Sequence, residues 1–327
     1  MPFLGVEIRV GEVNRTRVPI GEFLDSSPIT LPVMTIGGAH SGPTVYVQSG
    51  LHGDEQTGIE IVRRATASLD PKQMRGNLVV VPVANIPAHL ARTRGFLHEE
   101  RWLIDINRIF PGNPDGLLTE RIAAILLEEF VAAVDLTLDV HSALDGCTML
   151  PNVKVDPSDD QTGTLALRER AATAFGTKRI LYGARGAKLG TSDMARTLKT
   201  QADARGYPVV GAEMGESRRA SPEFVPLGVR GVHNVLKCMD MLDGDIERDA
   251  EPQPFSNVSV VHAAHGGGLR LDVELDQEVR AGETLGEVVD IFGQRTEDIV
   301  SPVDGFVLRK MLLGAINTGA EVLWIAN

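Results

Sequence analysis

The chain has 327 residues, of which 43% are apolar, with two cysteines and a formal net charge of −12 at pH 7. This length predicts one large domain with a smaller one beside it. The negative charge argues against a nucleic-acid partner, because phosphate binding needs a basic face. The apolar runs are too short to cross a membrane and no secretory leader is recognisable, so a cytoplasmic protein with reduced cysteines is expected.

Predicted strands and helices alternate over the first three quarters of the chain. Residues 6–10 and 31–36 have the alternating pattern of strands at a sheet edge. Four apolar runs predict buried strands at residues 44–48, 78–84, 136–140 and 209–212. Helical patterns cover residues 56–69, 117–134, 163–176 and 190–205. This alternation predicts an α/β fold with a mostly parallel central sheet and flanking helices.

The sequence changes character after residue 252. Short β-segments with glycines at their turns follow, at residues 258–263, 268–273, 284–289, 305–311 and 322–326. We expect residues 253–327 to form a small all-β module, separate from a main domain of residues 1–252. The stretch SPVDGFVL resembles the barrel-sandwich fold of biotinyl and lipoyl carrier domains. No lysine stands near residues 287–293, where a carrier would bear its cofactor, so a structural or lid role is expected instead.

Charged residues cluster where two predicted strands end. Residues 45–60 read VYVQSGLHGDEQTGIE, so a buried strand leads directly to His52 and Glu55. A second strand ends in Asp139-Val140-His141. Ligands of open α/β sheets bind beyond the carboxyl ends of strands. Two histidines and one carboxylate, with a fourth position left to water, form the ligand set of a catalytic zinc site.

From these residues alone, a metal site and ordinary polar residues at strand ends stand as equal alternatives. Asp139 precedes His141 by two residues and therefore points to the same face of the strand, where it could orient the imidazole. Gly50 and Gly53 predict a sharp turn around His52. Asp54 has no assigned role.

Four motifs in order, GLHGDEQTG, DINRIFPG, LDVHSA and AEMGE, resemble the succinylglutamate desuccinylase/aspartoacylase family, which is related to the zinc carboxypeptidases. The resemblance covers about residues 40–240. It implies that His52, Glu55 and His141 bind one Zn²⁺ per chain. It also implies that Asn107 and Arg108 hold a substrate carboxylate, which suits the fork geometry of a guanidinium. A surface ion pair is the alternative for Arg108.

The same resemblance implies a catalytic glutamate in a Glu-x-Gly step, which matches Glu213, with Glu216 as the alternative. It also implies an upstream arginine that binds the substrate or polarises its carbonyl. Arg92, Arg94 and Arg101 all lie in the right stretch, and Arg101 is favoured.

The predicted function is therefore that of a zinc-dependent amidohydrolase, with residues 1–252 as its catalytic domain. Such an enzyme removes the acyl group from an N-acyl amino acid or a related small amide, as a desuccinylase, aspartoacylase or N-acetyl-diaminobutyrate deacetylase does. It acts on linear amide bonds other than peptide bonds, using zinc-activated water and a glutamate base. The alternatives are a zinc carboxypeptidase that cleaves peptides and a non-catalytic, metal-bearing binding protein. The acyl group, the amine and a homo-oligomeric state are left open.

Overall fold

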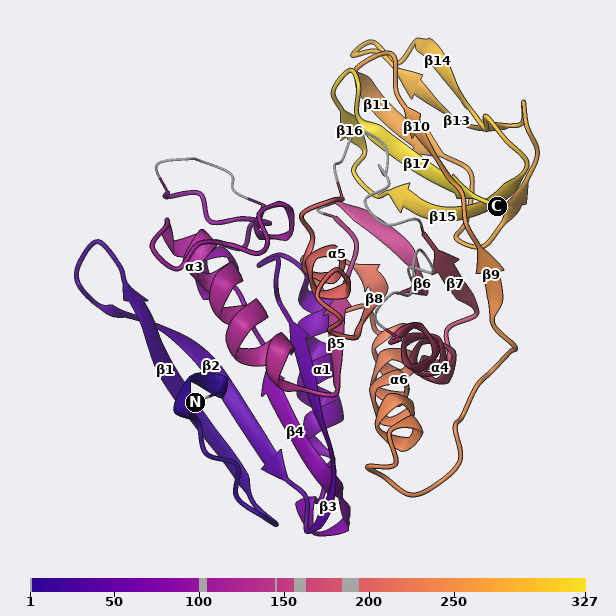
Figure 1. The fold of residues 1–327 in the computed structure, drawn as a ribbon. Helices are drawn as coiled ribbons and strands as arrows, with labels where there is room; N and C mark the ends of the chain where they lie inside the picture. Colours follow the sequence, from indigo (N-terminus) through magenta and orange to yellow (C-terminus); the bar gives the residue numbers. More distant parts are fainter. Residues whose placement is uncertain (1, 100–104, 145, 156–162, 184–193) are drawn as a thin grey trace.

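One large mixed sheet organises the fold. The computed structural model describes residues 2–99, 105–144, 146–155, 163–183 and 194–327. Within these residues the sheet has 13 strands, and its main path runs β1-β2-β4-β3-β5-β8-β6-β15-β17-β10. A second sheet of four strands lies in the C-terminal part of the chain, at the upper right of Figure 1. None of the helices in this described part has the length and apolarity that a membrane crossing requires.

Eight strands come from the first three quarters of the chain. They are β1 (Val13–Glu22), β2 (Pro28–Gly37), β3 (His40–Ser49), β4 (Arg75–Val81), β5 (Leu136–His141), β6 (Cys147–Val155), β7 (Arg179–Tyr182) and β8 (Val209–Glu216). Strands β3, β4, β5 and β8 lie at the four predicted apolar runs, and β2 contains the predicted edge segment. Residues 6–10 do not form a strand, because Val10 alone among them forms a β-bridge, to Gly37. The edge strand of the main sheet is β1 instead. The sequence pattern did not indicate β6 and β7.

The expectation of a mostly parallel sheet is wrong. Parallel pairing joins the central strands β4, β3, β5 and β8 and also holds β7 against β6. The pairs β1–β2, β2–β4, β6–β8 and β6–β15 are antiparallel. A short turn at residues 23–27 connects β1 to β2, and such a turn cannot join parallel neighbours. The parallel block is thus only the centre of a mixed sheet.

Helices cover both faces of the parallel block (Figure 1). They are α1 (Gln56–Ala67), α2 (Ile86–Ala91), α3 (Leu118–Ile125), α4 (Leu165–Phe175), α5 (Leu198–Asp203) and α6 (Val225–Cys238). Val45 and Val47 of β3 belong to the core under α1, α4 and α6, whereas Tyr46 belongs to the core under α3. Both faces of β3 are therefore buried, which explains its continuous apolar run.

Four helices differ from the prediction, and one of them, the short helix α2, was not predicted at all. The segment 117–134 is α3 followed by a π-helical turn (Leu126–Phe130) and a 3-10 turn (Val131–Ala133). The segment 190–205 contains α5, and its residues 190–193 lie outside the described residues. Helix α6 was missed, although its apolar residues recur with helical spacing; it contains Pro226 in its first turn and two glycines, which lower its helix propensity.

The C-terminal residues 253–327 form strands only, as predicted. They are β9 (Gln253–Phe255), β10 (Val258–His262), β11 (Gly267–Leu271), β12 (Glu278–Val279), β13 (Thr284–Val289), β14 (Arg295–Val300), β15 (Gly305–Met311), β16 (Ala315–Ile316) and β17 (Glu321–Ala326). Strand β15 pairs with β6, with Arg309 opposite Met149, and β9 pairs with β7. The main sheet therefore continues from the larger part of the chain into the C-terminal module.

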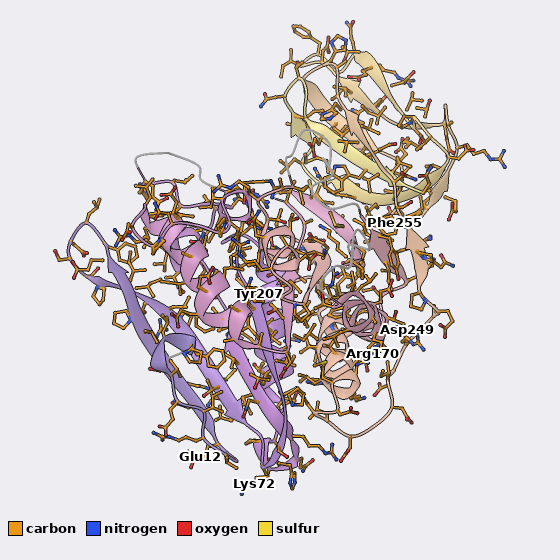
Figure 2. The ribbon with its side chains drawn as sticks, in the orientation of Figure 1. Glu12, Lys72, Arg170, Tyr207, Asp249 and Phe255 are labelled. Atoms are coloured by element: carbon orange, nitrogen blue, oxygen red, sulfur yellow. The ribbon has the colours of Figure 1, made fainter. Side chains whose placement is uncertain are left out.

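Side chains reinforce this junction. Asp276 accepts hydrogen bonds from Lys178 and from Arg179, the latter at 2.7 Å. The guanidinium of Arg179 also lies 3.7 Å from the centre of the Phe306 ring. Phe255, labelled in Figure 2, meets Phe306 edge-on with ring centres 5.5 Å apart. The Phe255–Phe306 contact lies within the module, and the module is attached through backbone pairing, ion pairs and the cation–π contact of Arg179.

Candidate metal centre

The turn after β3 delivers His52 and Glu55 to the carboxyl edge of the sheet. Gly50 has φ +62°, a backbone region that side chains disfavour, and it ends the strand. A Cβ atom on Gly53 would lie 2.1 Å from the carbonyl carbon of Ala88, so only glycine lets the turn pass α2 this closely. Glu55 occupies the N-cap position of α1, yet its side chain does not cap the helix. Its carboxylate is directed to two imidazoles instead.

His52, Glu55 and His141 form a buried cluster. The Nδ1 atom of His52 lies 2.6 Å from Glu55 Oε1, and Nδ1 of His141 lies 2.9 Å from Glu55 Oε2. One ligand atom from each of the three residues lies within 4.8 Å of the others. The three residues are only 2%, 2% and 7% exposed. The structure thus brings together two strand ends that are 89 positions apart in the sequence.

Each imidazole contacts a second carboxylate through Nε2, the ring nitrogen that does not face Glu55. His52 Nε2 lies 3.0 Å from Asp105 Oδ1, and His141 Nε2 lies 2.8 Å from Asp139 Oδ2. Carboxylates in this position fix the ring orientation of metal-binding histidines. Asp139 was expected in such a place. Asp105 was not, although it stands two residues before Asn107 in the motif DINRIFPG.

The electrostatics of the cluster follow from these pairs. Burial lowers the pKa of both imidazoles, but the adjacent carboxylates outweigh it and raise the pKa of His52 and, more strongly, of His141. Burial raises the pKa of Glu55, and the two imidazoles reverse this, so it lies below the ordinary value. The pKa of Asp105 is also lowered on balance, because His52 and Arg94 outweigh its burial.

The cluster suits a divalent cation. Glu55, Asp105 and Asp139 carry three negative charges, and Arg94 contributes one positive charge at 3.4 Å from Glu55 and 2.9 Å from Asp105. Two negative charges therefore remain when both imidazoles are neutral. Imidazole and carboxylate donors match the ligand preference of zinc. The residues present thus fit a zinc ion in donor type, burial and charge.

Glu213 lies next to this cluster in the sheet. In the parallel β5–β8 pair it is the register partner of His141. Its Oε1 atom accepts a hydrogen bond from Lys154 Nζ at 2.6 Å. Glu216, the alternative base, forms a two-point ion pair with Arg219, in which the Nη2–Oε1 distance is 2.8 Å. Lys154 was not considered from the sequence, because it lies on the unpredicted strand β6.

Asn107 and Arg108 share one 3-10 turn (Ile106–Arg108) beside Asp105. The side-chain oxygen of Asn107 accepts a hydrogen bond from Leu198 N at the start of α5, at 2.9 Å. Arg108 is 27% exposed, and its Nη1 lies 4.0 Å from Asp105 Oδ2. The carboxylate that holds His52 therefore also neighbours the arginine predicted to bind substrate.

The three candidate arginines upstream have different environments. Arg94 contacts both Glu55 and Asp105, as described above. Arg92 is the C-cap of α2, with a left-handed backbone conformation. Arg101, which was favoured, lies outside the described residues. Of the two described arginines, Arg94 is therefore the one at the cluster.

Asp54 is buried between the two ligands of the turn. It is 2% exposed, and neither of its carboxylate oxygens has a hydrogen-bond partner among the described residues. Burial raises its pKa, with the charge of Glu55 adding to the effect. Its backbone oxygen accepts a hydrogen bond from Arg218 N at 2.6 Å, which ties the turn to the segment after β8.

Fold and cluster together define an α/β protein with a candidate metal centre at the carboxyl ends of its parallel strands. Residues 41–239 match the succinylglutamate desuccinylase/aspartoacylase catalytic domain. The chain belongs to this family, as its four motifs predicted.

Individual relatives are similar over nearly the whole chain. The N-alpha-acetyl-L-2,4-diaminobutyric acid deacetylase of Halomonas elongata is 28% identical over 312 residues, which cover 91% of this chain and 86% of that protein. The crystal structure of a succinylglutamate desuccinylase/aspartoacylase from Rhodobacter sphaeroides has a TM-score of 0.85 at 25% identity, covering 99% of this chain and 98% of the other. The product-bound Ectoine utilization protein EutE (DoeB) from Ruegeria pomeroyi has the same fold, with a TM-score of 0.87, 23% identity and coverage of 98% and 97%. The first two names are those of deacylating hydrolases.

Proposed function

We propose that this protein is a zinc-dependent amidohydrolase that removes the acyl group from an N-acyl amino acid or a related small amide. The observation that carries the proposal is the buried His52–Glu55–His141 cluster, in which the Nε2 atom of each imidazole contacts a further carboxylate. The names of the relatives support deacylation as the reaction.

A zinc ion held by His52, Glu55 and His141 would supply Lewis acidity, which lowers the pKa of water and polarises an acyl carbonyl. Asp105 and Asp139 keep the two imidazoles oriented. Glu213 takes a proton from the attacking water and returns it to the leaving amine, as a general base and then a general acid. Its position beside His141 in the β5–β8 register supports this role over Glu216, which stands three residues further along β8.

Substrate binding falls to residues next to the cluster. The side-chain oxygen of Asn107 is used by α5, so its NH₂ group is the part directed to a ligand. The Arg108 guanidinium binds the amino-acid carboxylate through a two-point contact. Arg101 is retained as a second arginine that assists at the carbonyl. Residues 1–252 carry these groups, and residues 253–327 act as a structural module.

Metal analysis tests the first part of the proposal. We expect one equivalent of zinc in the purified protein and a large loss of zinc in His52→Ala. His262→Ala is the matched control, because this histidine lies at the end of β10 and bonds the Gly319 carbonyl oxygen. Absence of zinc from the native protein, or equal zinc in His52→Ala, would contradict the proposal.

A substrate panel tests the second part. Zinc-loaded protein should hydrolyse N-α-acetyl-L-2,4-diaminobutyrate, N-succinylglutamate or another N-acyl amino acid, and should leave a short unmodified peptide intact. Cleavage of the peptide alone would favour a carboxypeptidase instead. Binding of these amides without hydrolysis would favour a non-catalytic binding protein. Cys147 and Cys238 form no disulfide among the described residues. A reducing, cytoplasmic setting is part of the proposal.

A further inference from the structure

A groove with arginines on two sides lies beside α1. Its volume is about 950 Å³, and it lies between the outer surface of α1 and the β1–β2 edge of the main sheet, the edge seen at the left of Figure 1. Among the described residues that line it, none belongs to the metal cluster or to the candidate substrate-binding residues. It is therefore a separate feature, with no role in the proposed reaction.

Strand β1 supplies the first wall. Arg15 and Arg17 are two residues apart, so their side chains emerge on the same face of the strand. They stand opposite Met34 and Pro32 of β2, which also line the groove. Both arginines are exposed, and within the described part of the chain neither has an ion pair or a side-chain hydrogen bond. Their guanidinium groups are thus available to a ligand.

Helix α1 supplies the second wall. Glu60, Arg63, Arg64 and Ala67 line the groove, and their spacing places them on one stripe of the helix. Glu60 accepts from Arg64 Nε at 2.6 Å and from Arg63 Nη1 at 3.4 Å, so one carboxylate serves two arginines. These two side chains remain 63% and 66% exposed. Each guanidinium has five N–H donors, so most of them are left for other partners.

The charge of the groove is opposite to that of the chain. Four arginines and one glutamate give the groove three net positive charges, although the protein as a whole carries −12. A concave surface lined by one sign of charge concentrates counter-ions. Between the two walls, Pro32, Met34 and Pro82 add apolar surface. The groove therefore combines several anion-binding donors with an apolar floor.

We propose that this groove binds an organic polyanion, whose phosphate or carboxylate groups pair with the arginines and whose carbon skeleton lies on the apolar floor. Guanidinium forks match both kinds of oxyanion in two-point contacts. A ligand with about three negative charges balances the groove, and its volume is within the usual range for small-molecule sites, about 300–1,000 Å³.

Calorimetric titration of the zinc-loaded protein at low ionic strength tests the proposal. The probes are fructose 1,6-bisphosphate and benzene-1,3,5-tricarboxylate, which are both weak metal chelators. We expect one-to-one binding of at least one probe, and the preferred probe shows whether phosphate or carboxylate is the better partner. Added salt should weaken the binding, because the arginines are exposed.

Variants on both walls locate the binding. Arg15→Gln/Arg17→Gln should weaken the affinity about tenfold, and Arg63→Gln, which tests the opposite wall independently, should also weaken it. Arg270→Gln/Arg295→Gln is the matched control, because it removes two similarly exposed arginines of the C-terminal module. Hydrolysis of amides should be unchanged in all of these variants. Failure of both probes to bind, or equal affinity in the wild type and both groove variants, overturns the proposal.

Discussion

Lys154 and Glu213 form an ion pair in which Lys154 Nζ donates to Glu213 Oε1 at 2.6 Å. The two residues lie on the antiparallel neighbours β6 and β8, where Glu213 stands opposite Asn152. Their side chains are 23% and 15% exposed. The ammonium group therefore restricts the orientation of the carboxylate that we propose as the base.

Replacement of Lys154 by methionine should lower kcat about 10- to 100-fold and change KM much less. The reason is that Glu213 would lose its fixed orientation, while the groups that bind substrate would remain. Steady-state kinetics on an N-acyl amino acid measure both constants. Lys154→Arg should restore part of kcat, and Lys72→Met serves as an exposed control. An unchanged kcat in Lys154→Met would show that the ion pair has no role in catalysis.

The carboxylates behind the imidazoles should control metal affinity. Asp105→Asn and Asp139→Asn should each weaken zinc binding about 10- to 100-fold, because the rings lose the partners that orient them. Competition with a chromophoric chelator measures this affinity directly. Asp298→Asn, an exposed acid of β14, should bind zinc like the wild type. Wild-type affinity in both cluster variants would mean that the imidazoles are positioned by packing alone.

Glu213 and Glu216 should differ in their effect on turnover. Glu213→Gln should lower kcat about 10²- to 10⁴-fold with zinc still bound, because an amide then replaces the carboxylate that transfers protons. Glu216→Gln should mainly reduce thermal stability, because it breaks the Arg219 pair. Kinetics, zinc content and melting temperature, measured on both variants, separate the two effects. The reverse pattern would reassign the base to Glu216.

Asp276 should make the junction with the C-terminal module sensitive to acid. Burial raises its pKa, but the hydrogen bonds from Lys178 and Arg179 outweigh burial and lower it. A carboxylate with a lowered folded-state pKa stabilises the protein above its unfolded-state value of about 3.9, and this contribution is lost as the pH falls through the folded-state value.

Asp276→Asn should therefore reduce the free energy of unfolding by about 1–2 kcal/mol at pH 6 and by less at pH 3. Denaturant unfolding at the two pH values measures the difference. Asp115→Asn, an exposed acid far along the chain from this junction, should change stability little at either pH. A loss of the same size at both pH values would mean that charge on Asp276 does not stabilise the junction.

The sequence predicted the local features of the fold better than the long-range ones. The apolar runs of β3, β4, β5 and β8 identify buried strands, because both faces of each strand are covered. Strand β6 was not predicted, because Pro151, Asn152 and Lys154 interrupt its run of apolar residues. The direction of edge strands depends on which distant strand they pair with, and local periodicity carries no such information.

The same distinction applies to the candidate site. His52, Glu55 and His141 stand at the ends of recognisable strands, so their meeting could be anticipated from the rule for open α/β sheets. Arg94 was considered but not favoured, and its contact with Glu55 depends on the path of the chain after α2. Lys154 could not be found, because its place beside Glu213 requires the β6–β8 register.

The pairing of β15 with β6 has a consequence for biosynthesis. Strands β15 and β17 come from residues 305–326, yet they complete the same sheet that starts with β1. Until these residues leave the ribosome, β6 has unpaired backbone groups along part of one edge, and such edges invite association with other chains. The order of synthesis therefore makes completion of this sheet a late event, and a chain halted after residue 252 should aggregate rather than accumulate as a smaller folded protein.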